Sequence, residues 1–202
     1  MTPARAPVED PGGGTSHRDR LLAGLAEAIR EHGYAPTTVA EIVARARTSR
    51  RTFYQHFADR DGCLIALFDL LAERLIQVVT EAATGERPYL ERLDVTLAAY
   101  LDHVASDPAL MRAMILELPA IGAAGVRRDR ELTDRTARQV VRLVAEAAEH
   151  DATVVPLSLE GALVIVAGFR ELVVFTLEHG REPRELHGTA VDLVRRLTVR
   201  DA

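Results

Sequence analysis

The chain has 202 residues, of which 48% are hydrophobic and 27% charged, and its formal net charge at pH 7 is −5. This length and apolar fraction can bury one substantial core, or a small domain plus a larger one, whereas the single cysteine, Cys63, excludes a disulfide-built scaffold. The longest apolar run, residues 155–177, contains Glu160, Arg170 and Glu171. These charges exclude a lipid-facing span, so we expect no membrane partner.

The first fifteen residues hold three prolines and three consecutive glycines, so we expect a disordered tail over residues 1–15. No charged-then-apolar leader is present, which predicts a cytoplasmic protein. A first helix is predicted to begin at Ser16, with Asp19 in its first turn, and to end at Gly33. Its core face carries Leu21, Leu22, Leu25 and Ile29.

Two short helices and a tight turn follow. Thr38 and Glu41 have the spacing of a capping box, which predicts a helix start at Thr38, and Ser49 is the predicted cap of the next helix. In that next helix Phe53 and Phe57 lie four residues apart and are expected to anchor one side in a core. The remaining surface then carries Arg50, Arg51, Thr52, Tyr54, Gln55 and His56.

Positive charge is concentrated around this third helix. Residues 45–60 contain five arginines and one aspartate, a net charge of +4 on a chain whose total is −5. The chain contains neither lysine nor asparagine, so the choice of arginine says nothing about recognition and only its clustering counts. The turn reads Ala46-Arg47-Thr48-Ser49 without glycine, so a residue other than glycine is expected at positive φ, at a cost of about 1 kcal/mol.

The helix-turn-helix, the run Thr-Phe-Tyr-Gln-His-Phe, the following Asp-Arg and Leu64 together resemble the tetracycline-repressor (TetR) family of dimeric transcriptional regulators, over roughly residues 18–68. The resemblance implies that the helix from Ser49 to Phe57 lies in the major groove of DNA. By the same resemblance, phosphate contacts are expected from Thr37 or Thr38 and from Tyr54, His56 and Arg60. Arg50, Arg51 and Thr52 are then the candidates for base edges, and Thr48, Ser49 and Gln55 complete the predicted DNA-binding set.

The rest of the chain is predicted to be helical, which makes the expected fold all-α. The predicted domains are a helix-turn-helix domain at 16–62, a connecting helix at 63–83 and a ligand-binding and dimerisation domain at 84–202. Helices of this last domain are expected at about 88–105, 108–118, 126–150, 156–179 and 183–199, punctuated by Pro108, Pro119, Pro156 and Pro183.

The last two predicted helices carry heptad-like seams, with apolar or small residues spaced by alternating steps of three and four. Such seams resemble the four-helix dimer interface of the TetR family and predict a homodimer, although contacts within one chain explain the glycines nearly as well. The predicted interface residues are Gly161, Ile165, Gly168, Leu172, Phe175, Leu186, Ala190, Leu193 and Leu197.

The family resemblance also implies a small-molecule site among the helices of the second domain. Polar or adaptable residues within apolar helices are the candidates, although a role in the core or in a salt bridge explains each one, taken singly, better than ligand binding does. Arg170 is the sharpest, because a charge in this apolar helix must find an acid, an interface or a ligand. The candidate lining residues are Tyr100, His103, Met111, Met114, Glu117, Phe169 and Arg170.

The sequence therefore predicts a transcriptional regulator, most often a repressor in this family, that binds a palindromic DNA operator as a homodimer and is released by a small-molecule ligand. No phosphate loop, paired-histidine metal motif or nucleophile elbow is found, so no catalytic residue, metal or cofactor is expected. The alternative is a ligand-sensing or adaptor protein without specific DNA binding.

Overall fold

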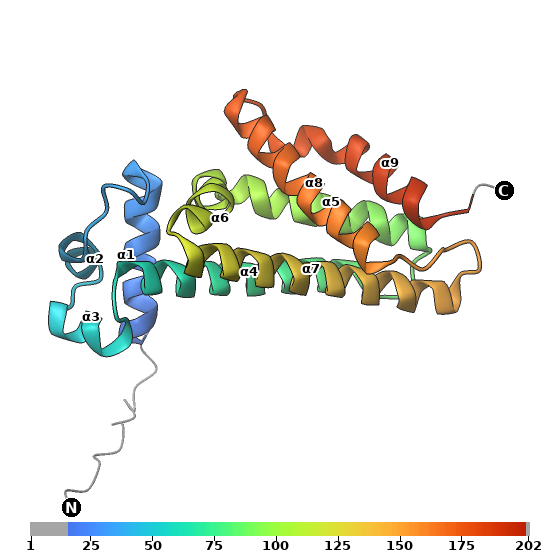
Figure 1. Cartoon of the computed structure of the whole chain (residues 1–202). Helices are drawn as coiled ribbons and strands as arrows, with labels where there is room; N and C mark the ends of the chain where they lie inside the picture. Colours follow the sequence, from blue (N-terminus) through green and yellow to red (C-terminus); the bar gives the residue numbers. More distant parts are fainter. Residues whose placement is uncertain (1–15, 201–202) are drawn as a thin grey trace, which may run out of the picture.

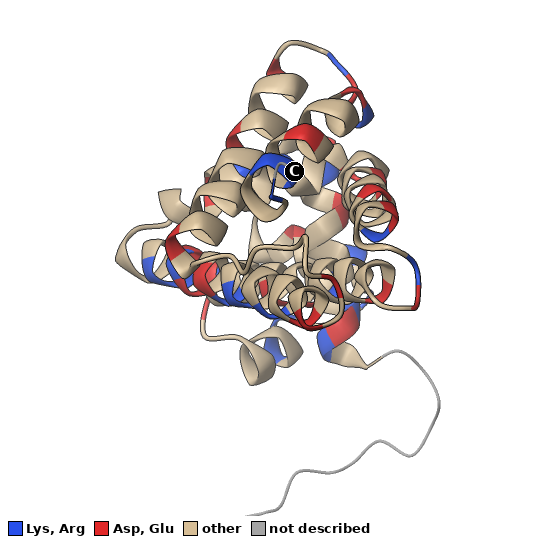
Figure 2. Ribbon diagram, turned by 90° about the vertical axis from the view of Figure 1, so that its right-hand side faces the viewer, with Lys and Arg blue, Asp and Glu red and all other residues tan. Residues whose placement is uncertain are grey.

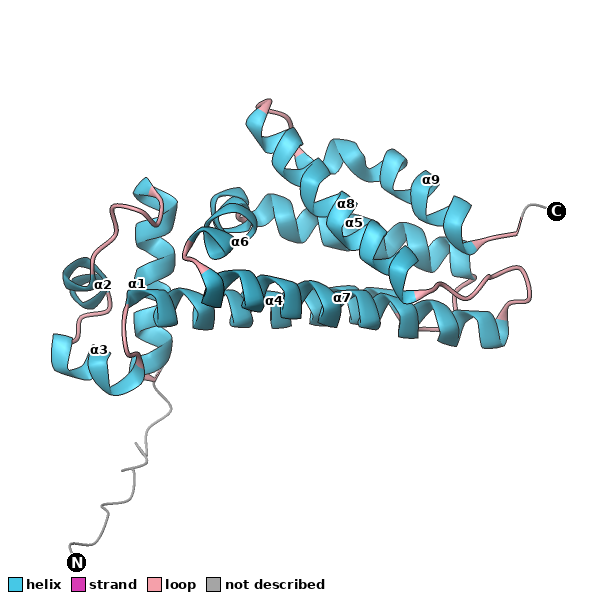
Figure 3. Ribbon diagram, in the orientation of Figure 1, coloured by secondary structure: helices cyan, strands magenta, loops and turns pink. Residues whose placement is uncertain are grey.

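The computed structural model describes residues 16–200 and consists of helices joined by short loops (Figures 1 and 3). The predicted tail at 1–15 lies outside the described residues. No strand occurs within 16–200, where only an isolated bridge pairs Val154 with Val199, so the all-α prediction is confirmed. In chain order the elements are α1 (His17–His32), α2 (Val39–Arg45), α3 (Arg50–His56), α4 (Arg60–Ala83), α5 (Tyr89–Ser106), α6 (Pro108–Ala120), α7 (Ala123–His150), α8 (Leu159–Glu178), the 3-10 turn η1 (Pro183–Leu186) and α9 (His187–Thr198).

The N-terminal helices α1 to α3 form a small bundle on the first turns of α4 (Figure 1). Side-chain caps start these helices as predicted: the hydroxyls of Ser16, Thr38 and Ser49 accept the backbone N–H three residues on, at 3.1, 3.2 and 3.1 Å. The capping box at Thr38 is only half formed, because the carboxylate of Glu41 binds Arg45 at 2.9 Å instead of the cap amide.

The turn between α2 and α3 has the predicted backbone conformation. Arg47 has φ 49°, and it is the only residue other than glycine at positive φ within residues 16–200. The approach of α1 to α2 also constrains the sequence, since a Cβ on Gly24 would lie 2.8 Å from the carbonyl oxygen of Ile42. Helices α1 and α2 are therefore closely packed, and the turn between α2 and α3 contains one residue other than glycine at positive φ.

Helix α4 runs from this bundle into a second, larger bundle of α5 to α9 and lies alongside α7 for much of its length (Figure 1). It begins at Arg60, capped by Asp59, whose carboxylate accepts the N–H of Gly62 at 2.7 Å. Basic and acidic residues are interspersed along the helices rather than separated by sign (Figure 2). Within the described residues no helix is long and apolar enough to cross a membrane.

Several predicted helix bounds differ from the structure. Helix α6 continues through Pro119 to Ala120, and α7 begins at residue 123 instead of 126, directly after Gly122 at φ 93°. Helix α8 begins at residue 159 instead of 156, because the Ser158 hydroxyl caps it through the N–H of Gly161 at 3.1 Å. The predicted helix 183–199 divides into η1 and α9.

Candidate nucleic-acid interface and internal cavity

Helix α3 has one buried face and one exposed face. Phe53 is fully buried in the core of the N-terminal bundle, and Phe57 packs beside it with 5.6 Å between ring centroids. The opposite face exposes five of the residues predicted to contact DNA, which are Arg50, Arg51, Tyr54, Gln55 and His56. Neither Arg50 nor Arg51 forms an ion pair or hydrogen bond with another residue of 16–200. Both guanidinium groups are therefore available to a partner molecule.

The small hydroxyl residues at the start of α3 serve the helix itself. Ser49 accepts the N–H of Thr52, and the two side-chain oxygens lie 3.0 Å apart. The hydroxyl of Thr52 is thus held over the first turn of α3, where its methyl group can still contact a base. Thr48 lies half-buried just before the helix.

One predicted DNA contact is wrong. Thr37 is fully buried, and its hydroxyl donates to the carbonyl of Gly33 at 2.8 Å, so it cannot present itself to a phosphate. Its neighbour Thr38 is exposed and caps α2. The sequence could not separate the two threonines, because the turn of chain after Gly33 decides which one points inward.

Arg60 has a structural role that the sequence did not reveal. Its Nη1 donates to the carbonyls of Ala35 at 3.1 Å and Thr37 at 2.6 Å, and its guanidinium lies 4.2 Å from the ring centroid of Tyr34. The Tyr34 hydroxyl in turn donates to Asp61, and burial raises the pKa of Tyr34. Arg60 thereby fastens the loop before α2 to the start of α4.

These contacts reduce the positive charge that α3 can offer. Of the five arginines in residues 45–60, Arg45 is paired with Glu31 and Glu41, and Arg60 is engaged with the loop. The arginines that remain on the surface of the helix-turn-helix are Arg47, Arg50 and Arg51. The positive patch is therefore smaller than the sequence count implies, and it is centred on the start of α3.

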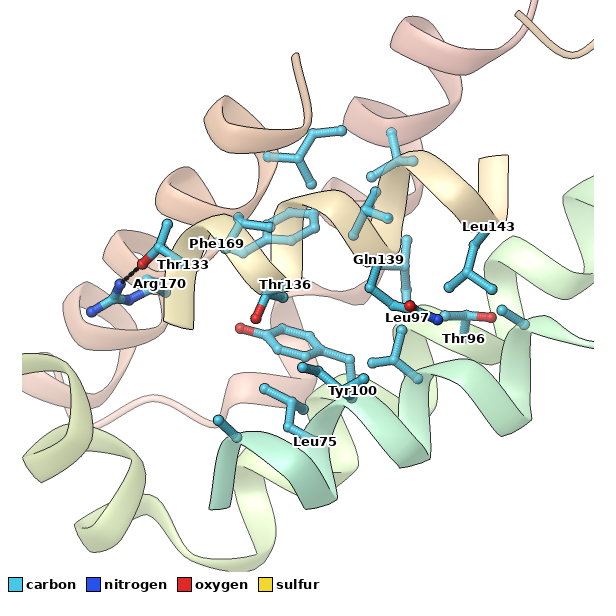
Figure 4. A pocket seen from close by; sticks show the side chains of 18 of the residues that line it. Leu75, Thr96, Leu97, Tyr100, Thr133, Thr136, Gln139, Leu143, Phe169 and Arg170 are labelled. Carbon is cyan, nitrogen blue, oxygen red and sulfur yellow. Dashed lines mark hydrogen bonds between the residues drawn. The ribbon is translucent and has the colours of Figure 1, made fainter. Parts of the chain in front are cut away.

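The larger bundle encloses a cavity of about 180 Å³ between α4, α5, α6, α7 and α8 (Figure 4). Most of its wall is aliphatic, with Leu75, Leu97 and Leu143 among the contributors. Tyr100 and Phe169 stack across the cavity with 6.0 Å between centroids, and burial raises the pKa of Tyr100 to about 12. Such a preformed, mostly apolar hollow is the usual form of a small-molecule site.

Arg170 lies at the cavity wall and forms an ion pair with Asp129, as expected for a charge in an apolar helix. Its Nη2 lies 2.5 Å from a carboxylate oxygen of Asp129, and its Nη1 donates to the hydroxyl of Thr133 (Figure 4). This ion pair lies at the cavity wall, and its two charges compensate each other. Hydroxyl and amide side chains from α5 and α7 also reach the wall, namely Thr96, Thr136 and Gln139.

Five of the seven predicted lining residues lie on the cavity wall: Tyr100, Met111, Met114, Phe169 and Arg170. The other two do not. His103 lies half-buried within electrostatic reach of Arg74, and burial together with that charge lowers its pKa. Glu117 turns toward α1 and accepts the backbone N–H of Tyr34 at 3.4 Å.

Sequence reasoning missed a polar line on α5. Arg92, Thr96 and Tyr100 follow one another at steps of four and all line the cavity. The spacing was readable in the sequence, but Arg92 and Thr96 resemble ordinary surface residues. Only the position of α7 and α8 across the cavity from α5 shows that this face is internal.

Helix α6 contacts both the cavity and the N-terminal bundle. Met111, Met114 and Leu118 line the cavity, while Leu110 and Leu118 also belong to the core cluster that contains the residues of α1. At the start of the helix, Asp107 binds Arg30 of α1 at 2.7 Å. Helix α6 therefore connects the cavity wall to α1 through core packing and an ion pair.

Helices α8 and α9 expose large apolar side chains on the outer edge of the larger bundle. Val164, Phe175, Leu193 and Leu197 are 68, 50, 44 and 47% exposed. Among the predicted interface residues, Gly168, Phe175, Leu193 and Leu197 are exposed and Gly161, Leu172 and Leu186 are half-buried.

Ile165 and Ala190, by contrast, are buried within the chain's own core, so their prediction as interface residues is wrong. The heptad seam therefore lies partly between helices of one chain, and Val164 replaces Ile165 on the outer face. Within the described residues no group of three or more His, Cys, Asp or Glu side chains could hold a metal ion.

The helix-turn-helix region of the chain matches a known protein family. Residues 21–67 match the family described as bacterial regulatory proteins, tetR family. The HTH-type transcriptional regulator TcmR of Streptomyces glaucescens is 28% identical over 60% of this chain and 57% of that protein. The HTH-type transcriptional repressor AcnR of Corynebacterium glutamicum is 33% identical over 33% of this chain and 36% of that protein. The matches thus span less than two thirds of these curated relatives.

The similarity of fold extends over almost the whole chain. The transcriptional regulator FadR from Bacillus subtilis, whose crystal structure is a complex with stearoyl-CoA, superposes with a TM-score of 0.74. The match covers 87% of this chain and 96% of that chain at 19% sequence identity. At this identity the likeness shows a shared fold, which includes the second bundle that the helix-turn-helix match leaves out.

Proposed function

We propose that the chain is a member of the tetR family of bacterial regulatory proteins and a ligand-responsive repressor that binds a palindromic DNA operator as a homodimer. The observation that carries this proposal is the exposed face of α3, where Arg50 and Arg51 have no partner among residues 16–200. A helix of this kind enters the major groove, where an arginine fork suits guanine and a threonine methyl suits thymine.

The size of the reading surface supports a dimer. A single seven-residue helix reaches only a few base pairs, and two equivalent helices one DNA turn apart roughly double the contacts and select an inverted repeat. The exposed apolar face of α8 and α9, formed by Val164, Phe175, Leu193 and Leu197, is the surface that we assign to the partner subunit. Burial of this face would remove four large apolar side chains from water.

Release of DNA is proposed to follow occupation of the cavity. A ligand that wedges α6 away from α7 would move Asp107 and Glu117, and through them α1 and the spacing of the two reading helices. The shift requires that the ligand bind one arrangement of the helices more tightly than the other. Met114 and Leu118 are the points where a ligand would push on α6. The role is one of binding, as in its relatives, which are named as regulators.

The proposal is tested by selecting bound sequences from a random duplex pool at near-physiological salt. An enriched inverted repeat is expected, because base contacts survive salt whereas nonspecific attraction to phosphates is lost. Absence of enrichment from a folded, dimeric protein would contradict the proposal and favour a sensor or adaptor without specific DNA binding. The enriched duplex then serves as the probe for ligand-induced release.

A further inference from the structure

One charged side chain that lines the cavity forms no ion pair within the described chain. Arg92 of α5 lines the cavity and forms no ion pair with any residue of 16–200. Its Nε is buried without a hydrogen-bond partner, and its one hydrogen bond runs from Nη1 to the carbonyl of Ala83 at 3.3 Å. A buried donor without an acceptor is unfavourable, so an acceptor that reaches this guanidinium is stabilised.

The other two charged residues that line the cavity form an ion pair, with Arg170 at 2.5 Å from Asp129. Asp151, which does not line the cavity, is within electrostatic reach of Arg92, but its carboxylate accepts hydrogen bonds from the backbone and hydroxyl of Thr153, at 2.9 and 2.6 Å, and makes no ion pair with the guanidinium. The residues that line the cavity therefore carry a net charge of +1, which a monoanion would neutralise.

The rest of the wall sets the shape of the ligand. Arg92, Thr96 and Tyr100 lie on one face of α5, and eight residues of helix separate the first from the last by about 12 Å along the axis. Thr96 uses its hydroxyl to bind the carbonyl of Arg92 at 2.6 Å, so it offers no strong site of its own. The rest of the wall is mostly aliphatic, with the stacked rings of Tyr100 and Phe169 and the polar side chains of Thr136 and Gln139 (Figure 4).

The volume of the cavity limits the size of the apolar part of the ligand. An engineered apolar cavity of about 150 Å³ holds one benzene molecule, so a cavity of about 180 Å³ holds about seven carbon atoms. We propose that the cavity binds an apolar monocarboxylate of about ten non-hydrogen atoms, with its carboxylate on Arg92 and its hydrocarbon part beside Tyr100 and Phe169. This inference rests on the proposed function, because it names the ligand class of the same cavity.

The test compares octanoate with octanamide, a neutral molecule of nearly the same shape, by calorimetric titration of the full-length protein without DNA. Octanoate should bind at least tenfold more tightly than octanamide. Arg92→Met should weaken octanoate binding by tenfold to a hundredfold and change octanamide binding by less than threefold. Arg92→Lys should retain most of the octanoate affinity, because it keeps the charge.

Arg87→Met is the matched control, since Arg87 is exposed in the loop before α5 and does not line the cavity. It should leave octanoate binding unchanged, and thermal unfolding of every variant should verify that it folds. Equal affinities for octanoate and octanamide, an Arg92→Met variant with unchanged octanoate affinity, or no octanoate binding to the wild type would each overturn the inference. These outcomes leave specific DNA binding untouched, whereas failure of DNA selection leaves the octanoate result standing, so the two proposals fail separately.

Discussion

The two bundles of this protein differ in where they place the residues that remain for binding: on the outer surface in the N-terminal bundle and around an internal cavity in the larger one. The N-terminal bundle buries Phe53 and Phe68 fully in its core and exposes Arg50 and Arg51 on the outer face of α3. The larger bundle leaves about 180 Å³ of its interior unfilled and turns Arg92, Tyr100 and Arg170 inward. A rigid, closely packed support suits a surface that must match a groove, whereas incomplete packing suits a guest that supplies the missing contacts.

The arginines show the same contrast. On the N-terminal bundle Arg45 and Arg60 are bound within the fold, which leaves Arg50 and Arg51 at the surface. In the larger bundle Arg170 is paired with Asp129, which leaves Arg92 as the charged residue of the cavity wall without an ion pair. In both bundles some arginines stabilise the fold, and the arginines without an ion pair mark the surface that remains for binding.

The largest effect is expected from breaking the packed support. Phe53→Ala removes a fully buried ring beneath the reading face and should lower the free energy of unfolding by about 3–5 kcal/mol, as measured by urea denaturation. DNA binding should be lost with it. Tyr54→Ala, on the exposed side of the same helix, is the control, and a similar loss of stability there would contradict the contrast between the two faces.

The assignment of the exposed apolar face of α8 and α9 to the dimer interface can be tested by introducing a charged residue there. Leu193→Glu places a carboxylate on the face assigned to the partner subunit, so sedimentation should show monomers, and affinity for an inverted repeat should fall by at least about tenfold. Leu90→Glu, at an equally exposed apolar residue of α5, should leave the protein dimeric. If Leu193→Glu stayed dimeric with full affinity, this face would not be the interface.

Substitutions on α3 should distinguish residues that contact bases from residues that contact phosphates. Arg51→Ala is expected to cost about 1–3 kcal/mol at the selected operator and to relax its sequence preference, because a base contact is lost. Tyr54→Phe should weaken binding to all sequences about equally, since a phosphate contact carries no sequence information. Gel-shift titrations on the operator and on a scrambled duplex measure both, and unchanged selectivity of Arg51→Ala would remove it from the base-reading set.

Filling the cavity should strengthen the fold and weaken the response. Leu143→Phe adds volume at the apolar wall and should raise the free energy of unfolding by about 0.5–2 kcal/mol while reducing ligand-induced release of DNA. Thermal unfolding and operator release report the two effects. Lower stability combined with an intact response would mean that the wall at Leu143 has no room, and that the ligand does not use it.

The smallest effect is expected at the strained turn. Arg47→Gly removes a side chain from a backbone at φ 49° and should raise stability by less than about 1 kcal/mol, because the added entropy of glycine in the unfolded chain offsets part of the relief. Arg45→Gly, in a regular helix, should instead destabilise the protein. A loss of stability in Arg47→Gly would show that the side chain stabilises the turn through its own contacts.

The sequence by itself determined the features that depend on neighbours within one or two helical turns. Hydroxyl caps at Ser16, Thr38 and Ser49 form where the spacing predicted, and Phe53 turns inward while Arg51 stays exposed. The turn without glycine adopts positive φ, as its residues implied. Such features follow from periodicity and from local hydrogen bonds, which the order of residues fixes.

The tertiary structure alone decided which distant side chains meet. It buried Thr37, enclosed Ile165 and Ala190 within one subunit, and turned Glu117 toward α1 instead of the cavity. It also brought Arg92 to the cavity wall, where its Nε is buried without a hydrogen-bond partner. A cavity is the space that helices far apart in sequence fail to fill, so no local pattern encodes it, and its residues become visible only when the helices are packed.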